Sequence, residues 1–336
     1  MQTEQLQTTA PDLFSRCGDS NILTGPGPAP DKVNLQMDAS IAREVDQALW
    51  ENQVLRAMDY YEVDVRVQNR VVILNGHITS STSNDRVEKA IKSIPLILGL
   101  QNHLVLDDQL TTEVASALAN LEHLYECKFF TGVTNGVVTL HGNVKNEIIK
   151  SLAGKCVAEN SNVRGVINCV RVLGVISELQ ETPVYQPAIG QEILFQNGVS
   201  GIVRQVIINP DNRRVTAMLL AGRFTDQLQE FRAMSNNEAR PVERQIIVSV
   251  DLVRYLTKFS GFLTISSNDG NRFADFDASA FRSPDAGWVP PYPYCPRDVL
   301  FNANAGLPDQ AIAGVALHSI LAIKIKETLE EQNNGQ

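Results

Sequence analysis

Apolar residues recur in two blocks of the chain with nearly the same arrangement. Residues 67–78 read VQNRVVILNGHI, and residues 133–144 read VTNGVVTLHGNV. In each block, apolar residues stand on both sides of a polar pair, which predicts two strands joined by a tight turn. A single offset of 66 residues carries Gly76 onto Gly142 and also aligns a second block downstream. One offset that aligns two separate blocks indicates a duplicated unit of about that length.

The periodicity around each hairpin predicts the rest of the repeat. Apolar residues every three or four positions indicate helices with one buried face, and alternation indicates half-buried strands. The first helix is expected to be capped by Asp38 or Ser40. In the first repeat, helix, strand, strand, helix and strand are expected at about 38–60, 63–67, 71–75, 83–94 and 101–106. In the second repeat, the same elements are expected at 110–124, 126–134, 137–141, 147–159 and 165–173.

Four glycines are the candidate structural residues of these repeats. Gly76 and Gly142 follow the second strand of each hairpin, where a bend or a close backbone approach is expected. Gly99 and Gly165 stand at the start of the last strand of each repeat. Residues of this kind define a fold and do not by themselves indicate an activity.

Residues 183–270 have a different pattern, with several strands and no good helix. Turn signals such as Asn197-Gly198 separate the apolar runs, as in small antiparallel β-barrels. A polar insertion at 225–239 interrupts the series. The strands are expected at 190–196, 199–209, 215–224, 246–250 and 262–266.

Both ends of the chain differ from these folded segments. Residues 1–34 contain a Gly-Pro run and little periodic apolar content, which indicates a flexible tail, with a proline-rich docking motif as the alternative. Residues 273–301 are rich in proline and aromatic residues. They predict an extended strap that covers an apolar patch or an open edge of the barrel, or else an exposed docking site.

A final helix is expected from Pro308 to about Leu329, apolar on more than half of its surface. Such a helix must be buried against its own chain or against another copy, so we expect a homo-oligomer, most simply a dimer.

The predicted fold class is α+β. The expected domains are a tail (1–34), two repeats (35–107 and 108–175), a barrel (183–270), and the strap with the final helix (271–336).

Composition narrows the functional classes. The net charge is −9 and no segment is basic, so a nucleic-acid partner is disfavoured because phosphate binding needs clustered Lys and Arg. The same charge opposes simple adhesion to anionic lipid.

We expect neither a secretory signal nor a spanning helix, since no basic and apolar leader and no run of about 18 apolar residues is seen. The five cysteines form no CxxC motif, which favours free thiols in a reducing cytoplasm.

The sequence contains no catalytic, cofactor-binding or metal-binding motif. HExxH, GxSxG, Walker A and GxGxxG patterns are all missing from it. His77 and His141 flank the paired glycines and are expected to be exposed surface residues without a metal. Cys156 and Cys169, on the second helix and last strand of the second repeat, are expected to be buried thiols. We therefore expect no enzyme and no cofactor, with an unrecognised active site as a third interpretation.

The paired order of hairpin, glycine, helix and a Gly-x-x-Asn strand resembles the BON domain. The resemblance covers roughly residues 37–174. The family is named for bacterial osmotic-stress and nodulation proteins, and the resemblance implies an αββαβ fold. It also implies attachment to phospholipid or another hydrophobic surface, as part of a bacterial stress response.

Residues 189–220, IGQEILFQNGVSGIVRQVIINPDNRRVTAMLL, resemble the PRC-barrel family. That family includes the cytoplasmic part of a photosynthetic reaction-centre subunit and half of a ribosome-maturation factor. The resemblance implies an SH3-like barrel that binds other macromolecules, and it carries no catalytic residues over.

We therefore expect a non-enzymatic binding or scaffold protein in a bacterial cytoplasm, peripheral at the membrane. Its BON-like repeats would attach to phospholipid or another hydrophobic surface, and its barrel would bind a macromolecule, with a protein partner favoured. The alternative is an RNA- or ribosome-associated factor that acts through the barrel, for which Arg204, Arg213 and Arg214 could form a basic cluster. The balanced charge of the barrel segment does not support this alternative.

Overall fold

The computed structural model describes residues 32–175, 183–224, 243–257 and 259–303. These residues divide into two compact units. The first unit holds the described residues up to Ser116 together with Gly132–Gly136, and the second unit holds the remainder. Nearly all of the predicted N-terminal tail, the polar insertion and the final helix lie outside the described residues, so those predictions stay untested.

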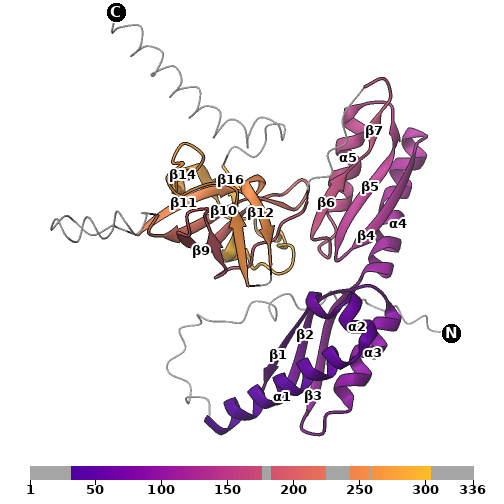
Figure 1. The fold of residues 1–336 in the computed structure, drawn as a ribbon. Coiled ribbons are helices and arrows are strands. Elements are labelled where there is room, and N and C mark those ends of the chain that lie inside the picture. The colour runs from indigo at the N-terminus through magenta and orange to yellow at the C-terminus, as the bar shows by residue number, and fades with distance from the viewer. Residues whose placement is uncertain (1–31, 176–182, 225–242, 258, 304–336) are drawn as a thin grey trace, which may run out of the picture. The chain divides into compact units, whose positions relative to one another are not determined.

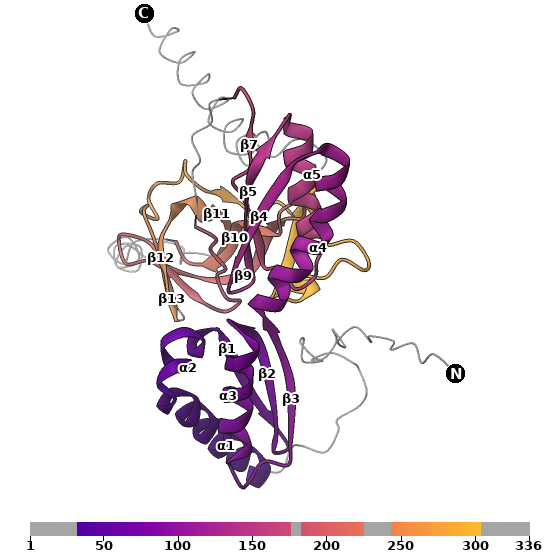
Figure 2. The same ribbon diagram turned by 90° about the vertical axis from the view of Figure 1, so that its right-hand side faces the viewer.

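The first unit contains the first repeat, and the order of its elements is αββαβ. Its elements are α1 (Lys32–Glu51), α2 (Gln53–Met58), the 3₁₀ helix η2 (Tyr60–Glu62), β1 (Val63–Gln68), β2 (Val71–Ile78), α3 (Ser81–Lys92) and β3 (Gly99–Leu106). β1 and β2 form an antiparallel hairpin, and β3 pairs with β2 in parallel because α3 carries the chain back between them. The helices lie on one face of this three-stranded sheet (Figures 1 and 2).

Helices and strands of the first unit meet in one apolar core. Val72 and Leu74 alternate along β2 and are fully buried, while α1 contributes Ile41, Val45 and Leu49. The four-residue spacing places these α1 residues on one stripe of the helix, which faces the sheet. The amphipathic pattern in the sequence therefore corresponds to a helix packed on a half-buried sheet.

The first predicted helix is interrupted at Asn52. Its side-chain Oδ1 accepts hydrogen bonds from the backbone N–H groups of Val54 (3.2 Å) and Leu55 (3.3 Å). Asparagine is a strong N-cap because its side chain replaces the backbone acceptor that a continuing helix would supply. The helix predicted as continuous to about residue 60 is therefore two helices.

The second repeat has the same αββαβ order. Its elements are α4 (Asp107–Tyr125), β4 (Lys128–Thr134), β5 (Val137–Val144), α5 (Glu147–Ala158), β6 (Gly165–Asn168) and β7 (Arg171–Val172). Both β6 and β7 pair with β5 in parallel, so the last predicted strand is broken in two. The side-chain oxygen of Asn168 accepts a hydrogen bond from the N–H of Val170 at 3.3 Å, which diverts the backbone between the two pieces.

The rest of the second unit is a larger sheet. Its strands are β8 (Glu192–Leu194), β9 (Ser200–Asn209), β10 (Arg214–Gly222), β11 (Arg244–Ser249), β12 (Val253–Leu256), β13 (Ser260–Leu263), β14 (Ala274–Asp275), β15 (Phe281–Arg282) and β16 (Val299–Asn302). The main strand order is β12-β13-β8-β9-β10-β11-β14. The expected antiparallel barrel is matched only in part. β13 pairs with β8 and β16 pairs with β9 in parallel, and no pairing among the described strands closes the sheet.

The core of this larger sheet extends beyond the predicted boundary at residue 270. Phe273, Tyr294 and Phe301 are buried in the same cluster as Met218. Trp288 packs on this cluster, with its ring centre 4.8 Å from that of Phe301 in an edge-to-face arrangement. The strap thus supplies core residues, and a domain that ended at residue 270 would lack them.

Candidate functional site

Two of the four candidate glycines occupy a backbone conformation that favours glycine. Gly76 has a φ of +121° and Gly142 a φ of +150°. A side chain at Gly76 would meet the carbonyl oxygen of Glu62, and a Cβ at Gly142 would lie 2.5 Å from the carbonyl oxygen of Lys128. Both glycines lie within the second strand of their hairpin, beside the residues where the first strand begins, and the close backbone approach there leaves no room for a side chain.

The other two candidate glycines have more ordinary surroundings. A Cβ at Gly99 would lie 3.6 Å from the methyl groups of Val71, which is normal van der Waals contact. A Cβ at Gly165 would lie 3.3 Å from Val184 and 3.4 Å from Arg214, so the neighbouring chain is close there. Neither glycine has a positive φ. Their geometry is that of strand starts and not of a binding site.

Each hairpin turn is held by an aspartate from the helix that opens its repeat. The carboxylate of Asp38 accepts hydrogen bonds from the N–H groups of Asn69 and Arg70, both at 2.8 Å. The carboxylate of Asp107 accepts from Asn135 at 2.6 Å and from Gly136 at 2.9 Å. All four turn residues have positive φ, as a type I′ turn requires. The sequence interpretation gave Asp38 a helix-capping role, whereas the structure uses it on the turn.

His77 lies beside the second of these aspartates. Its side chain is buried, and its Nδ1 is 3.5 Å from Oδ1 of Asp107. A side chain at Gly136 would collide with the His77 ring, so the Asn-Gly turn provides the space that the imidazole fills. His77 is therefore not the exposed residue that the sequence predicted, whereas His141 is exposed. No pattern in the sequence connects His77 with Asp107.

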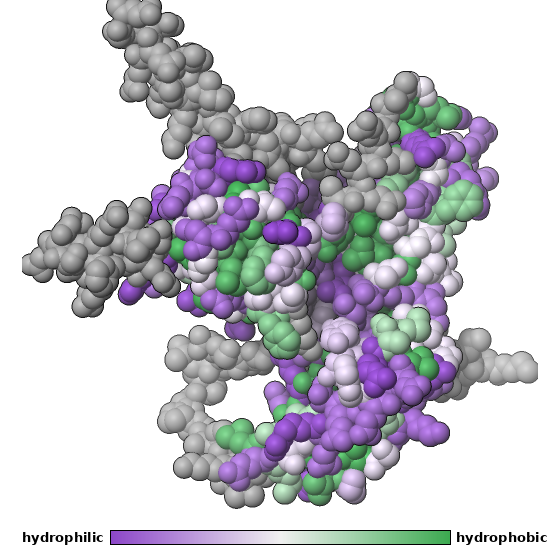
Figure 3. Space-filling view, in the orientation of Figure 1, coloured by the Kyte–Doolittle hydropathy of each residue, from purple (hydrophilic) through white to green (hydrophobic). Residues whose placement is uncertain are grey.

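Large apolar and aromatic side chains are exposed where α1 ends and α2 follows. The α1–α2 corner comprises Trp50, Val54, Arg56, Met58, Tyr60 and Tyr61. Trp50 is 43% exposed, Met58 58% and Tyr61 64%. In Figure 3, hydrophobic surface lies among hydrophilic residues over the part of the molecule where Figure 1 places α2.

The aromatic rings of the α1–α2 corner contact one another. The Tyr60 ring centre is 5.2 Å from both the Trp50 and the Tyr61 ring centres, with edge-to-face planes in each pair. The guanidinium of Arg56 lies 5.2 Å from the centre of the Trp50 ring. These contacts restrict the side-chain torsions of the three rings.

The surroundings of this corner are acidic. Residues 44–62 contain five carboxylates and a single basic residue, Arg56. The Tyr60 hydroxyl donates a hydrogen bond to Asp46 at 2.7 Å, and this bond, with burial, raises the pKa of Tyr60 to about 12. Tyr60 therefore stays neutral and acts as a donor, and the corner is an apolar surface with an acidic margin.

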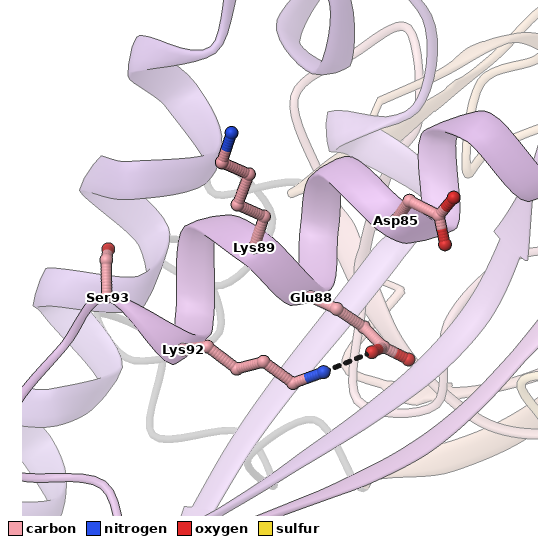
Figure 4. Close-up of a pocket in the computed structure, with 5 residues that line it drawn as sticks. All are labelled: Asp85, Glu88, Lys89, Lys92 and Ser93. Carbon is pink, nitrogen blue, oxygen red and sulfur yellow. Dashed lines mark hydrogen bonds and ion pairs between the residues drawn. The ribbon is translucent and has the colours of Figure 1, made fainter.

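A shallow pocket lies on α3, lined by Asp85, Glu88, Lys89, Lys92 and Ser93 (Figure 4). The Lys92 ammonium is 2.7 Å from the Glu88 carboxylate, and Asn102 also donates to Glu88 at 3.1 Å. These contacts, Lys92 first, lower the pKa of Glu88. The charges of Lys92 and Glu88 are thus matched within one helix, which is the arrangement of a solvated helix face and not of an active site.

The chemistry of the described side chains gives no further candidate. Within the described residues, no three His, Cys, Asp or Glu side chains gather as metal ligands would. Cys127, Cys156 and Cys169 are free thiols, and of the pair expected to be buried only Cys169 is fully so. Cys295 is disulfide-bonded, so the expectation of free thiols is wrong for this residue. No helix in the described ranges is long and apolar enough to cross a membrane.

The repeated αββαβ units and the aspartate-held hairpins define a tandem of small α+β domains. Residues 37–108 and residues 106–174 each match the BON domain, so the chain contains two BON domains in tandem. BON domains are commonly binding domains. This match supports the predicted pair of BON-like repeats. It includes no residue of the larger sheet.

Two solved structures are similar to part of the chain. One is CdsD, a structural protein of the type III secretion system of Chlamydia trachomatis, and the other is the C-terminal domain of CdsD. Both are 15% identical with a TM-score of 0.34 and cover 40% of this chain. This chain covers 63% of the first structure and 67% of the second. No curated protein matches the chain.

Proposed function

We propose that the protein is a non-enzymatic scaffold, and that the α1–α2 corner of its first BON domain attaches it to a phospholipid surface. The exposed group of large aromatic and apolar side chains at this corner carries the proposal. Single exposed apolar residues are ordinary on soluble proteins, whereas a contiguous group of them marks an interaction surface. Indole and phenol rings have an apolar body and a polar edge, which suits the boundary between headgroups and acyl chains.

The acidic margin of the corner determines how it would bind. Carboxylates on both sides of the rings oppose adhesion to anionic lipid, so attraction must come from burial of the apolar side chains. Such binding is weak for a small patch and changes little with ionic strength, because salt screens charge interactions and not apolar burial.

Trp50 provides a direct probe of this contact. The chain has two tryptophans, so Trp288→Phe leaves Trp50 as the only one, and its emission then reports on the corner alone. With phosphatidylcholine vesicles we expect a blue shift of that emission and co-sedimentation, both nearly equal at low and high salt. Met58→Ser combined with Tyr61→Ser should abolish both signals, since it removes most of the exposed apolar surface.

Leu124 supplies the matched control. It is 70% exposed and stands at the position of the second repeat that corresponds to Met58 under the 66-residue offset. Leu124→Ser should leave binding unchanged if the corner of the first BON domain is the contact. Absence of co-sedimentation at either salt would remove lipid from the proposal, and a steep loss with salt would contradict the apolar mechanism.

We further propose that the larger sheet is a PRC-barrel-like module for a macromolecular partner, and that the protein is peripheral at a membrane. The RNA-binding alternative loses support from the arginines on which it depends. Arg213 is 2% exposed and donates to backbone carbonyls, and Arg214 donates to the carbonyl of Pro183. Two of the three arginines are thus engaged within the chain and do not form a surface for phosphate.

A further inference from the structure

A buried arginine joins the larger sheet to the second BON domain inside the second unit. Arg213 stands at the end of the turn between β9 and β10. Its Nε donates to the carbonyl of Val163 at 2.6 Å, and its Nη2 donates to Ser161 at 3.2 Å and to Val289 at 2.9 Å. Two of these carbonyls belong to the loop between α5 and β6 of the BON domain, and the third belongs to the strap of the larger sheet.

The surroundings of Arg213 stabilise its charge without a carboxylate. Burial lowers the pKa of Arg213 to about 10, which reflects the cost of removing a cation from water. The carbonyl dipoles offset this cost, and the guanidinium lies 5.3 Å from the centre of the Trp288 ring. The guanidinium presents five N–H donors in a rigid planar fork that suits carbonyls spread over several segments, whereas the lysine ammonium is a compact point charge with three donors.

Other contacts join the same two parts around this arginine. The N–H of Val166 in β6 donates to the carbonyl of Asn212 at 2.9 Å. The Lys155 ammonium of α5 is 3.2 Å from the carboxylate of Asp211. We infer that Arg213 is a positioning residue that makes the second BON domain and the larger sheet one cooperative body, so that neither opens without the other.

Hydrogen exchange in increasing urea tests this coupling in the full chain. The readouts are the exchange midpoints of β5 for the BON domain, of β10 for the larger sheet, and of β2 for the first unit. In the wild-type protein we expect the midpoints of β5 and β10 to coincide. In Arg213→Met the midpoints of β5 and β10 should separate by roughly 1 M urea or more, since either the BON domain or the larger sheet then opens at a lower urea concentration than the other. The midpoint of β2 should not move.

Arg204 provides the matched control, because it is an exposed arginine on the adjoining strand β9. Arg204→Met should keep the midpoints of β5 and β10 together. If Arg213→Met does not fold, Arg213→Lys replaces it, and a smaller separation is expected because the charge is kept without the fork. Separate midpoints in the wild-type protein, or coincident midpoints in the Arg213 variants, would overturn the inference.

Discussion

Gly142 shows how one position in the hairpin depends on the absence of a side chain. Its φ is +150°, and a Cβ there would lie 2.5 Å from the Lys128 carbonyl oxygen, so both the backbone and its surroundings exclude larger residues. We expect Gly142→Val to reduce the free energy of unfolding by about 1–3 kcal/mol, because the hairpin must distort to admit the side chain. Urea unfolding followed by circular dichroism would measure the loss.

Gly132 is the control for this substitution, because it lies on β4 of the same hairpin with open space around its Cβ position and no positive φ. Gly132→Val should cost little or stabilise the strand, since β-branched residues favour sheets. Equal stability of the Gly142→Val variant and the wild-type protein would show that the structural role given to Gly142 is wrong.

Contacts between single residues that are far apart in the chain are the part of the structure that the sequence predicts least. The 66-residue offset predicts where the glycines fall, because a repeat preserves backbone constraints within each copy. It does not reveal that Asp38 holds a turn 31 residues away, or that His77 is buried beside Asp107. Such contacts depend on how a helix end meets a hairpin, and the local pattern of apolar residues carries no information about them.

Among the elements, the two hairpins differ in how deeply the hydrogen bonds that hold their turns are buried. The N–H of Gly136 is buried, and Asp107 is itself buried, whereas the N–H of Asn69 is exposed in the first hairpin. Asp107→Ala should therefore cost about 1–3 kcal/mol of unfolding free energy, since it leaves a buried donor without its acceptor. Asp38→Ala should cost less, because water can replace the lost acceptor.

Asp108 follows Asp107 directly and is the control for these variants, because its replacement removes a negative charge without removing a buried hydrogen bond. Asp108 is exposed, and its contacts to Ser81 and Gln109 lie at the surface. Asp108→Ala should change stability least of the three variants. Urea unfolding measures the free energy lost in each variant. If Asp38→Ala loses as much as Asp107→Ala or more, burial of the turn hydrogen bonds is not the cause of the difference.

Element order was predictable, and the pairing of strands was not. Helical and alternating periods gave both αββαβ repeats and most strands of the larger sheet. The short strands β12, β14, β15 and β16 were not predicted, and the parallel pairing of β13 with β8 and of β16 with β9 was not foreseen. A period of two is the same in parallel and antiparallel strands, so direction depends on connections that the pattern does not encode.

At the scale of the whole molecule, assembly is the main untested prediction. Residues 308–329 lie outside the described residues, and their apolar pattern predicts a helix that is buried in its own chain or in a dimer. Ile320→Glu with Ile323→Glu would charge the shared face, so light scattering should show a smaller particle that stays folded. Lys326→Glu is the control, because it adds a carboxylate at a position that is already polar.

Two results would decide against assembly. A wild-type mass equal to one 37.0 kDa chain at tens of micromolar would show that the protein is a monomer. Outright unfolding of the Ile320 and Ile323 double variant would indicate that the helix packs in its own chain, since a core helix does not accept buried charge.

The pairing of β16 with β9 also sets the order in which the chain can fold during its synthesis. The sheet of the first BON domain is complete at Leu106, whereas the larger sheet needs Asn302. The ribosome adds about 5–20 residues per second, so the intervening stretch takes roughly 10–40 s to emerge. Throughout the later part of that interval, Val206 and Ile207 of β9 can pair with β10 on one side, but β16, their partner on the other side, has not yet been made. This edge is therefore where a nascent chain would most need a chaperone.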